Sequence, residues 1–279
     1  MSFVSAISLV RQTEGMHENL RQFFSWLKAV IVHPTGQKGL YPRFIRIALF
    51  LMAGVILFVL VFVLFVWVGV FGRIPGTEEL RNIDHQVATE VYSADSVLLG
   101  KYFLQERSTI PSSQISAGLK QALIATEDIR FYQHRGIDAR SMLRVLIKGV
   151  FLQRESAGGG STLTQQLAKN LYPRRSYWIL SLPINKIREM IIARRLERLY
   201  SKDEILVLYL NTIPFGDNVY GIKTAAERFF SVPVNQLTLD QSAVLIGMLK
   251  ATHRYNPRLF PDRARQRRDV VLQQMEKYD

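Results

Sequence analysis

The chain has 279 residues, a formal net charge of +13, 48% hydrophobic residues and no cysteine. The absence of cysteine excludes disulfides and thiolate metal sites, and the basic excess favours anionic partners such as phosphates, nucleic acid or an acidic membrane surface. Once an apolar segment of membrane-spanning length is subtracted, about 200 residues remain, which is enough for one domain with its own core.

The N-terminal part of the chain divides into a mixed segment and an apolar run. Residues 1–46 combine aromatic, apolar and basic side chains without the short apolar core and cleavage site of a signal peptide. They form either an interfacial amphipathic helix or a loosely ordered tail. Residues 47–71 are uncharged and almost wholly apolar. At about 1.5 Å per residue, a helix of this length exceeds the roughly 30 Å hydrocarbon core, so we predict a single transmembrane helix.

The charges on either side of the apolar run predict its orientation. Lys38, Arg43 and Arg46 precede it without an intervening acid, whereas the basic residues that follow it stand beside glutamates. A positive excess on the N-terminal side places the N-terminus in the cytoplasm and the following domain outside the cytoplasmic (inner) membrane. Lipid is therefore a better anionic partner than nucleic acid.

Beyond a linker at residues 72–84, we expect one extracytoplasmic domain at residues 85–262. Alternating residues in 85–103, with turn residues at 94–96, predict a small β-hairpin. Ser112 or Ser113 is the expected N-cap of a helix that leads to Glu127. The rest of the domain has helical patterns and no convincing second sheet.

Residues 125–138 place adjacent carboxylates, an aromatic residue, a histidine and a glycine at the end of this helical pattern. If the helix runs through residue 130, Leu123 and Ile124 lie four and three positions before Glu127, and Phe131 lies four after it, on one face. Apolar surroundings disfavour the charged form of a carboxylate, which suits a group that takes up a proton near neutral pH. The alternative is a solvated glutamate at a frayed helix end.

A glycine-rich turn followed by a helix comes next, after a segment at 140–154 that we interpret as a core helix with snorkelling basic side chains. The run is Gly158-Gly159-Gly160-Ser161-Thr162-Leu163-Thr164-Gln165-Gln166-Leu167-Ala168-Lys169-Asn170. The unpaired N–H groups at the start of such a helix suit a phosphate. The leucines fall on one side of this helix, whereas the other side carries Thr162, Gln165, Gln166 and Lys169.

A second carboxylate directed toward the core follows an apolar aromatic stretch. Residues 172–183, with basic flanks, are either an interfacial membrane contact or part of the core. In the helix at 185–200, Glu189 shares the apolar stripe of Ile192 and Leu196. The alternative for Glu189 is a buried salt bridge with an arginine.

The C-terminal third carries helix signals without chemistry. Ser201 with Glu204, and Thr238 with Gln241, form capping boxes that open two helices to which we assign a packing role. Residues 263–279 are interpreted as a basic C-terminal helix or the start of a linker.

Four of these motifs together resemble a known family. Glu127-Asp128-x-x-Phe131-x-x-His134-x-Gly136 resembles the first signature of the peptidoglycan glycosyltransferases, glycosyltransferase family 51. Residues 159–170 and 186–197 resemble the second and third signatures, and residues 204–211 with the following Gly216 resemble the fourth. The set is similar to monofunctional transglycosylases and to the N-terminal half of class A penicillin-binding proteins. The resemblance implies a mainly α-helical fold, with a lysozyme-like lobe and a smaller membrane-associated jaw that residues 172–183 would help to form.

The resemblance also implies an activity and its site. The family polymerises lipid II with inversion at the donor anomeric carbon and release of undecaprenyl diphosphate, in cell wall biogenesis. Glu127 would be the general base and Glu189 would assist the departing diphosphate, with a divalent cation, Mg²⁺, as expected cofactor. Lipid II, the lipid-linked growing strand and membrane lipid are the expected partners, with elongation or division machinery as further candidates. The remaining expected substrate-binding residues are Asp128, Phe131, His134, Gly160, Ser161, Thr162, Gln165, Gln166, Lys169, Asn170, Lys186 and Arg188.

One departure from the pattern leaves a cation unassigned. The third signature usually begins with Arg-Lys, whereas this chain has Asn185-Lys186. The candidates to replace the missing cation are Arg174, Arg175, Arg188 and Arg194.

Two other functions compete with the polymerase. A lysozyme-like hydrolase or lytic enzyme also uses two carboxylates, but glycan hydrolysis releases no phosphate and leaves the basic helix with Lys169 unexplained. A membrane-anchored scaffold that binds anionic lipid leaves the inward placement of Glu127 and Glu189 unexplained.

Overall fold

The computed structural model describes residues 21, 25, 40–83, 89–93, 95, 98–102, 106–107, 110–152 and 160–278. The chain divides into two compact units, Met1–Phe65 and Val66–Asp279, and each is described by itself. The two alternatives for residues 1–46 fall almost wholly outside the described residues.

The first unit contains most of the long helix α2 (Leu40–Val68). Its stretch Phe44–Val68 has 25 residues and a mean hydropathy of 3.3, and its large apolar side chains, such as Phe50 and Phe58, are exposed. A core helix of a soluble protein would bury such side chains. By length and composition α2 can therefore cross a membrane, as predicted. It ends before Gly69, whose φ of +91° is accessible to glycine at no steric cost.

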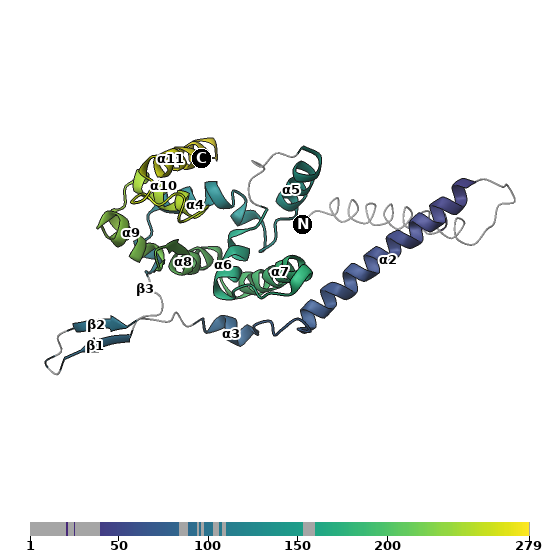
Figure 1. The fold of residues 1–279 in the computed structure, drawn as a ribbon, viewed down its shortest axis with the longest axis horizontal. Helices are drawn as coiled ribbons and strands as arrows, with labels where there is room; N and C mark the ends of the chain where they lie inside the picture. Colours follow the sequence, from purple (N-terminus) through teal and green to yellow (C-terminus); the bar gives the residue numbers. More distant parts are fainter. Residues whose placement is uncertain are drawn as a thin grey trace, which may run out of the picture. The chain divides into compact units, whose positions relative to one another are not determined.

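The second unit is mainly helical (Figure 1). Its helices are α3 (Thr77–Arg81), α4 (Ala117–Glu127), α5 (Ala139–Leu152), α6 (Leu163–Leu171), α7 (Ser181–Leu199), α8 (Lys202–Thr212), α9 (Ile222–Phe230), α10 (Leu239–Met248) and α11 (Pro261–Tyr278). Short 3₁₀ turns lie at η1 (Ser112–Gln114), η2 (Phe131–Gln133), η3 (Trp178–Leu180) and η4 (Val234–Gln236). In the core, α4 packs against α10 and α11, and α6 packs against α7 and α8. Leu123, Leu167 and Leu196 are fully buried there, and truncating such a leucine to alanine costs about 2–5 kcal/mol.

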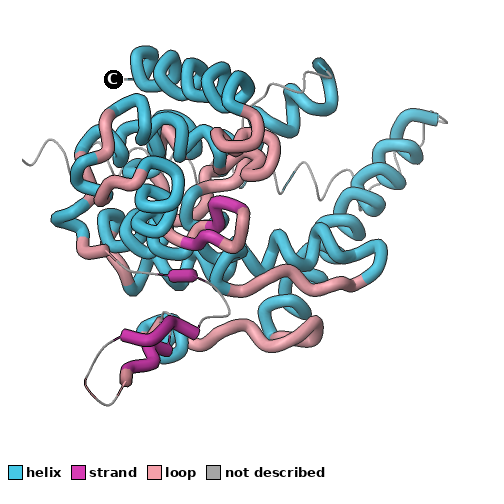
Figure 2. The backbone as a smooth tube through the Cα atoms, turned by 60° about the vertical axis from the view of Figure 1, so that its left-hand side comes forward, coloured by secondary structure: helices cyan, strands magenta, loops and turns pink. Residues whose placement is uncertain are grey.

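Two small sheets accompany the helices, and Figure 2 shows their strands in magenta. The predicted hairpin is confirmed, because β1 (Thr89–Tyr92) and β2 (Leu98–Tyr102) pair antiparallel. The expectation of no second sheet is wrong: β3 (Glu106–Arg107), β5 (Val219–Tyr220) and β4 (Pro214–Gly216) form one, in that order. Strands of two or three residues are too short to show an alternating pattern. Asp217 and Asn218, both with positive φ, make the turn between β4 and β5, as Asn and Asp often do in tight hairpins.

The start and end of α4 differ from the prediction. Ser112 and Ser113 lie in η1, and the N-cap is Ser116, whose side chain accepts a hydrogen bond from the Leu119 N–H. The helix ends at Glu127, so Phe131 belongs to a separate turn. The argument that Phe131 follows Glu127 by one helical turn is therefore wrong.

Further along the chain, the predicted helix signals have mixed outcomes. Both capping boxes are confirmed, at the starts of α8 and α10. The interpretation of α5 as an ordinary core helix is wrong for Leu143, which is exposed.

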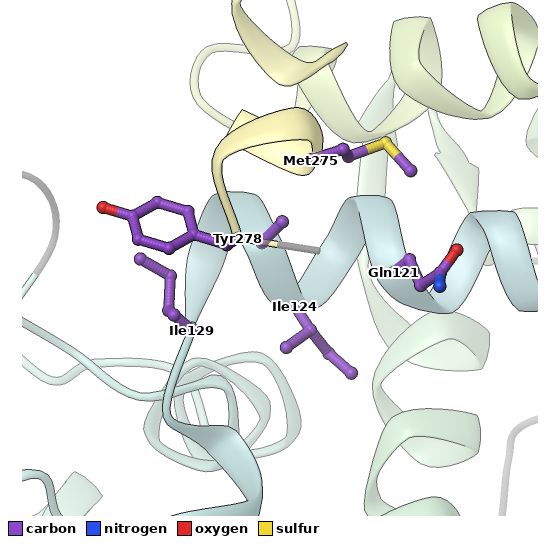
Figure 3. A pocket seen from close by; sticks show the side chains of 6 residues that line it. Gln121, Ile124, Ile129, Met275 and Tyr278 are labelled. Carbon is purple, nitrogen blue, oxygen red and sulfur yellow. The ribbon is translucent and has the colours of Figure 1, made fainter. Parts of the chain in front are cut away.

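The C-terminal helix packs against the helix that carries Glu127. α11 contacts both α4 and α10 and buries Ala264 and Val271. Figure 3 shows a small pocket of about 100 Å³ between the ends of α4 and α11. Its lining comprises Gln121, Ile124, Ala125, Ile129, Met275 and Tyr278. α11 thus covers one side of α4.

Candidate active site

Glu127, the last residue of α4, is held by a chain of two hydrogen bonds. The Gln166 side-chain amide donates to Glu127 Oε2 at 2.9 Å, and the Tyr209 hydroxyl donates to Gln166 Oε1 at 2.9 Å. Because Oε1 accepts from Tyr209, the amide nitrogen must face Glu127. Complete burial raises the pKa of Tyr209 well above its usual value, and the nearby charge of Glu127 adds to this shift. Tyr209 therefore remains a donor, and Glu127 is presented as a half-buried acceptor.

Asp128 occupies the positive end of α6. Its carboxylate is buried and accepts from the Leu163 N–H at 3.0 Å, while His134 Nε2 lies 2.9 Å from its Oδ2. Leu163 is the first residue of α6, where a negative charge is stabilised by the helix dipole. Thr162 caps the same end by accepting from the Gln165 N–H. The expectation that these N–H groups bind phosphate is therefore wrong, since protein groups already fill that position.

Gly136 of the first motif joins α6 to α7. Its φ is +82°, and a Cβ there would lie 2.9 Å from the Ala193 carbonyl oxygen, so only glycine fits. The Gly136 carbonyl accepts from the Thr162 hydroxyl at 2.8 Å and from the Gln165 amide at 3.1 Å. This glycine lets the loop after Glu127 approach both helices.

Glu189 is 5% exposed and lies between two cations. Arg174 Nε donates to its Oε1 at 2.7 Å, and Lys186 Nζ donates to its Oε2 at 3.3 Å. Lys186 also donates to Ser161 Oγ at 2.8 Å. Burial lowers the pKa of Lys186, Glu189 opposes that shift, and the charges of Arg174 and Lys169 add to it. The buried salt bridge considered as an alternative is thus present, within a cluster of cations.

Asn185 occupies the first position of the third signature, where the family usually has an arginine, and its contacts position another arginine. It is buried; its amide nitrogen donates to the Arg175 carbonyl at 2.7 Å, and its Oδ1 accepts from the Arg175 N–H at 3.1 Å. This two-way pairing fixes the loop that carries Arg174. Among the four candidate arginines, Arg174 is the one whose guanidinium hydrogen-bonds Glu189.

Two other candidate arginines have different partners. Arg188 is buried and donates to the carbonyls of Phe71 and Arg73, each at 3.2 Å, and to the Tyr177 hydroxyl at 2.7 Å. The exposed Arg194 donates to the Arg135 carbonyl. The contacts of Arg188 therefore hold the segment that follows α2 against α7, and none of them is to the Glu189 cluster.

Burial divides the expected substrate-binding residues into two groups. Phe131, Thr162 and Gln165 are at most 2% exposed and Asp128 is 7% exposed, so these side chains contact mainly other protein groups, and their expected substrate contacts stay predictions. His134 is bound to Asp128. The accessible group comprises Gly160, Ser161, Gln166, Lys169, Asn170 and Lys186.

Tyr209 and Asn185 have roles that the sequence did not assign, whereas Arg174 was one of the four candidate arginines. Tyr209 lies in a helix to which the sequence gave only a packing role. Its signal would have been a tyrosine at a buried position, since a buried hydroxyl needs a partner.

The described residues do not fit a protein-held Mg²⁺ site. Among them, no three His, Asp or Glu side chains gather into a group that could hold a metal ion. Glu189 already accepts hydrogen bonds from Arg174 and Lys186, and a metal ion at the same oxygens would be repelled by these cations.

Comparison with known proteins places this geometry in a family. The model of the transglycosylase family matches residues 95–276. This span contains Glu127, Glu189 and helix α6, which contacts Glu127. The chain belongs to the transglycosylase family. It is 40% identical over 205 residues to penicillin-binding protein 1A of Escherichia coli (strain K12), covering 73% of this chain and 23% of that protein.

Other relatives are similar over a comparable share of the chain. Penicillin-binding protein 1F of Bacillus subtilis (strain 168) is 38% identical over 198 residues, covering 71% of this chain and 27% of that protein. The crystal structure of penicillin-binding protein 1A from Haemophilus influenzae matches with 25% identity and a TM-score of 0.38. The match covers 71% of this chain and 19% of that chain. The chain spans about a quarter of the length of the curated relatives it matches.

Proposed function

We propose that the chain is a peptidoglycan glycosyltransferase that polymerises lipid II into glycan strands, inverting the donor anomeric carbon and releasing undecaprenyl diphosphate. The observation that carries this proposal is the pair of carboxylates connected through α6. Gln166 in α6 contacts Glu127, while Ser161, just before α6, contacts the lysine that binds Glu189. One carboxylate accepts from a neutral amide and the other binds two cations, which suits a reaction that moves a proton and releases a diphosphate.

In the proposed reaction, the oxygen of the acceptor 4-hydroxyl attacks the donor anomeric carbon, and Glu127 accepts the proton of that hydroxyl. The new C–O bond forms as the bond from that carbon to the diphosphate oxygen breaks, and the electron pair leaves with the diphosphate. Arg174, Lys186 and Lys169 supply the positive charge that stabilises the leaving group. Glu189 holds Arg174 and Lys186 in position for this task.

The proposed location is the cytoplasmic (inner) membrane, with α2 as the single-pass anchor, the N-terminus in the cytoplasm and the catalytic unit outside. Support comes from η3, where Trp178 is 86% exposed and Ile179 is 72% exposed. Exposed tryptophan beside basic residues favours a membrane interface, whereas burial in the core, the other alternative for residues 172–183, does not fit these side chains. η3 is therefore our candidate for the membrane-associated jaw.

The experiment that tests this function is polymerisation of purified lipid II by the full chain in detergent. Wild type is compared with Glu127→Gln and with Glu78→Gln, a matched control whose exposed carboxylate contacts only Arg81 among the ion pairs of the described residues. We expect polymer from wild type and from the control, and near-total loss with Glu127→Gln.

Other outcomes would contradict parts of the proposal. Cleavage of preformed glycan strands without polymer formation would make the chain a hydrolase. Polymer from Glu127→Gln at the wild-type rate would keep the function and exclude this base. Parallel reactions with Mg²⁺ and with a chelator test the expected metal, and isothermal titration without substrate should show no Mg²⁺ binding by the protein itself.

A further inference from the structure

A basic pocket lies beside the segment that follows α2. It has a volume of about 440 Å³, and its lining comprises Arg73, Pro75, Glu79, Leu171, Tyr172, Pro173, Arg174, Arg175 and Arg188. Four arginines thus face one glutamate. A pocket with this excess of positive charge is complementary to an anion.

Two of the arginines converge on one point of the backbone. A Cβ at Gly72 would lie 2.6 Å from Arg175 Nη1 and 3.2 Å from Arg188 Nη1, and Gly72 has a φ of +102°. Like charges this close repel each other unless an opposite charge neutralises them. The part of the chain that the structure describes supplies no salt bridge to Arg175 or Arg188.

The single acid of the pocket is already engaged at its edge. Glu79 lies 3.4 Å from Arg73, and both side chains are well exposed, so the pair contributes little in water. Tyr172 hydrogen-bonds Glu79 as well, and the pKa of Tyr172 is raised to about 12, chiefly by burial and then by the charge of Glu79. Glu79 therefore neutralises Arg73 in part and leaves Arg175 and Arg188 without a counter-charge.

If α2 is the membrane anchor, few residues separate the pocket from the membrane surface. Arg73 comes five residues after Val68, the end of α2, and five residues span at most about 18 Å. On its other side, Arg175 is three residues before the exposed Trp178 of η3. A basic surface next to a membrane attracts anionic head groups, and tryptophan is enriched at both membrane–water interfaces.

We propose that this pocket binds the phosphate of an anionic phospholipid head group that is not a substrate of the enzyme. The guanidinium groups of Arg73 and Arg175 offer donors in a planar arrangement that matches phosphate oxygens. Arg188, whose Nη atoms are bound to Phe71, Arg73 and Tyr177, adds positive charge. Arg174 lines the pocket and also binds Glu189. A lipid phosphate in the pocket therefore shares one guanidinium with the catalytic cluster.

Native mass spectrometry of the full chain in an uncharged detergent tests this proposal. The chain is titrated with phosphatidylglycerol, phosphatidylcholine or inorganic phosphate, in the absence of lipid II. The test variant carries Arg73→Gln and Arg175→Gln. The control carries Arg81→Gln and Arg265→Gln, which remove the same charge from exposed arginines outside the pocket.

We expect wild type and the control to retain one phosphatidylglycerol, and the test variant to bind it at least about tenfold more weakly, as loss of charge-assisted hydrogen bonds predicts. Arg73→Gln alone, at an 83% exposed side chain, should weaken binding without affecting thermal unfolding. This single variant keeps the test valid if the double variant fails to fold.

Three results would overturn the proposal. Equal retention of phosphatidylcholine, or equal loss in the control, would show that the arginines do not select the lipid. Saturation by inorganic phosphate at the same concentration would assign the pocket to a free anion. One-for-one displacement of phosphatidylglycerol by added lipid II would assign it to the substrate site. Because lipid retention is measured without turnover, its failure is distinct from failure of the proposed polymerase function.

Discussion

Glu127 and Glu189 differ in everything that surrounds their carboxylates. Glu127 ends α4, is half-buried, and accepts from the neutral amide of Gln166. Glu189 lies within α7, is nearly fully buried, and accepts from two cations. Gln166 donates a neutral hydrogen bond to one oxygen of Glu127, whereas both oxygens of Glu189 accept charge-assisted bonds, which are roughly twice as strong. The same side chain thus serves as a proton acceptor in one place and as an anchor for cations in the other.

The largest expected effects separate these two roles. Glu127→Gln should lower the polymerisation rate by about 10²–10⁴-fold, the usual contribution of a general base, and should leave thermal stability nearly unchanged. Glu189→Gln should lower the rate by about 10–100-fold, because the cations that stabilise the leaving group lose their position. It should also lower the free energy of unfolding by about 1–3 kcal/mol, less than for a fully buried pair, because Arg174 is 41% exposed.

Rates of lipid II consumption and thermal unfolding of both variants measure this difference. Glu78→Gln controls for the loss of a surface carboxylate. If both variants lost activity and stability to the same extent, the distinction between the two carboxylates would be wrong.

The next effect concerns Asn185. Asn185→Arg restores the residue that the third signature usually has, yet we expect it to lower activity. The variant loses both hydrogen bonds to Arg175 and places a charge at a 5% exposed position. We expect a loss of about 2–4 kcal/mol, as for other buried polar groups left without partners. Thermal unfolding and the polymerisation rate measure the outcome. Higher activity in this variant would show that Arg174 is a poor replacement for the missing cation.

A smaller effect should follow from Tyr209→Phe, which keeps the ring and removes the donor to Gln166. Its amide can then rotate and present its oxygen to Glu127. We expect a loss of about 0.5–1.5 kcal/mol in stability, the net worth of one hydrogen bond, and a several-fold lower polymerisation rate with an altered pH profile. Tyr132→Phe is the matched control, because it removes an exposed hydroxyl that bonds Asp203. An unchanged pH profile in Tyr209→Phe would leave this tyrosine with a packing role.

The sequence predicted the features that short-range patterns determine. The apolar helix, the hairpin and both capping boxes depend on residues that are neighbours in the chain, and so does the inward direction of Glu189. These features are visible in composition and spacing because helical and strand periodicity repeat within a few residues.

The features that it missed depend on pairs far apart in the chain. Tyr209 and Gln166 are 43 positions apart, and Asp128 and Leu163 are 35 apart, so no local pattern places them together. The phosphate site expected at α6 was wrong for this reason, since nothing in residues 158–170 indicates that Asp128 caps the helix. Arg174 could not be chosen among four arginines, because the choice depends on the pairing of Asn185 with a loop ten residues earlier.

The smallest expected effect is a pH dependence at Lys186. Burial lowers the pKa of Lys186 from its ordinary value of 10.5, so in the window between the two values the unfolded chain binds more protons than the folded one. Stability contributed by this residue therefore rises with pH through that window. The free energy of unfolding of wild type, relative to Lys186→Gln, should increase as the pH rises toward 10.5, measured by chemical denaturation in detergent. Lys277→Gln, at an exposed lysine of α11, should show a constant difference from wild type. A difference at Lys186 that is equally constant would mean that the charge of Glu189 fully offsets the effect of burial on the pKa of the lysine.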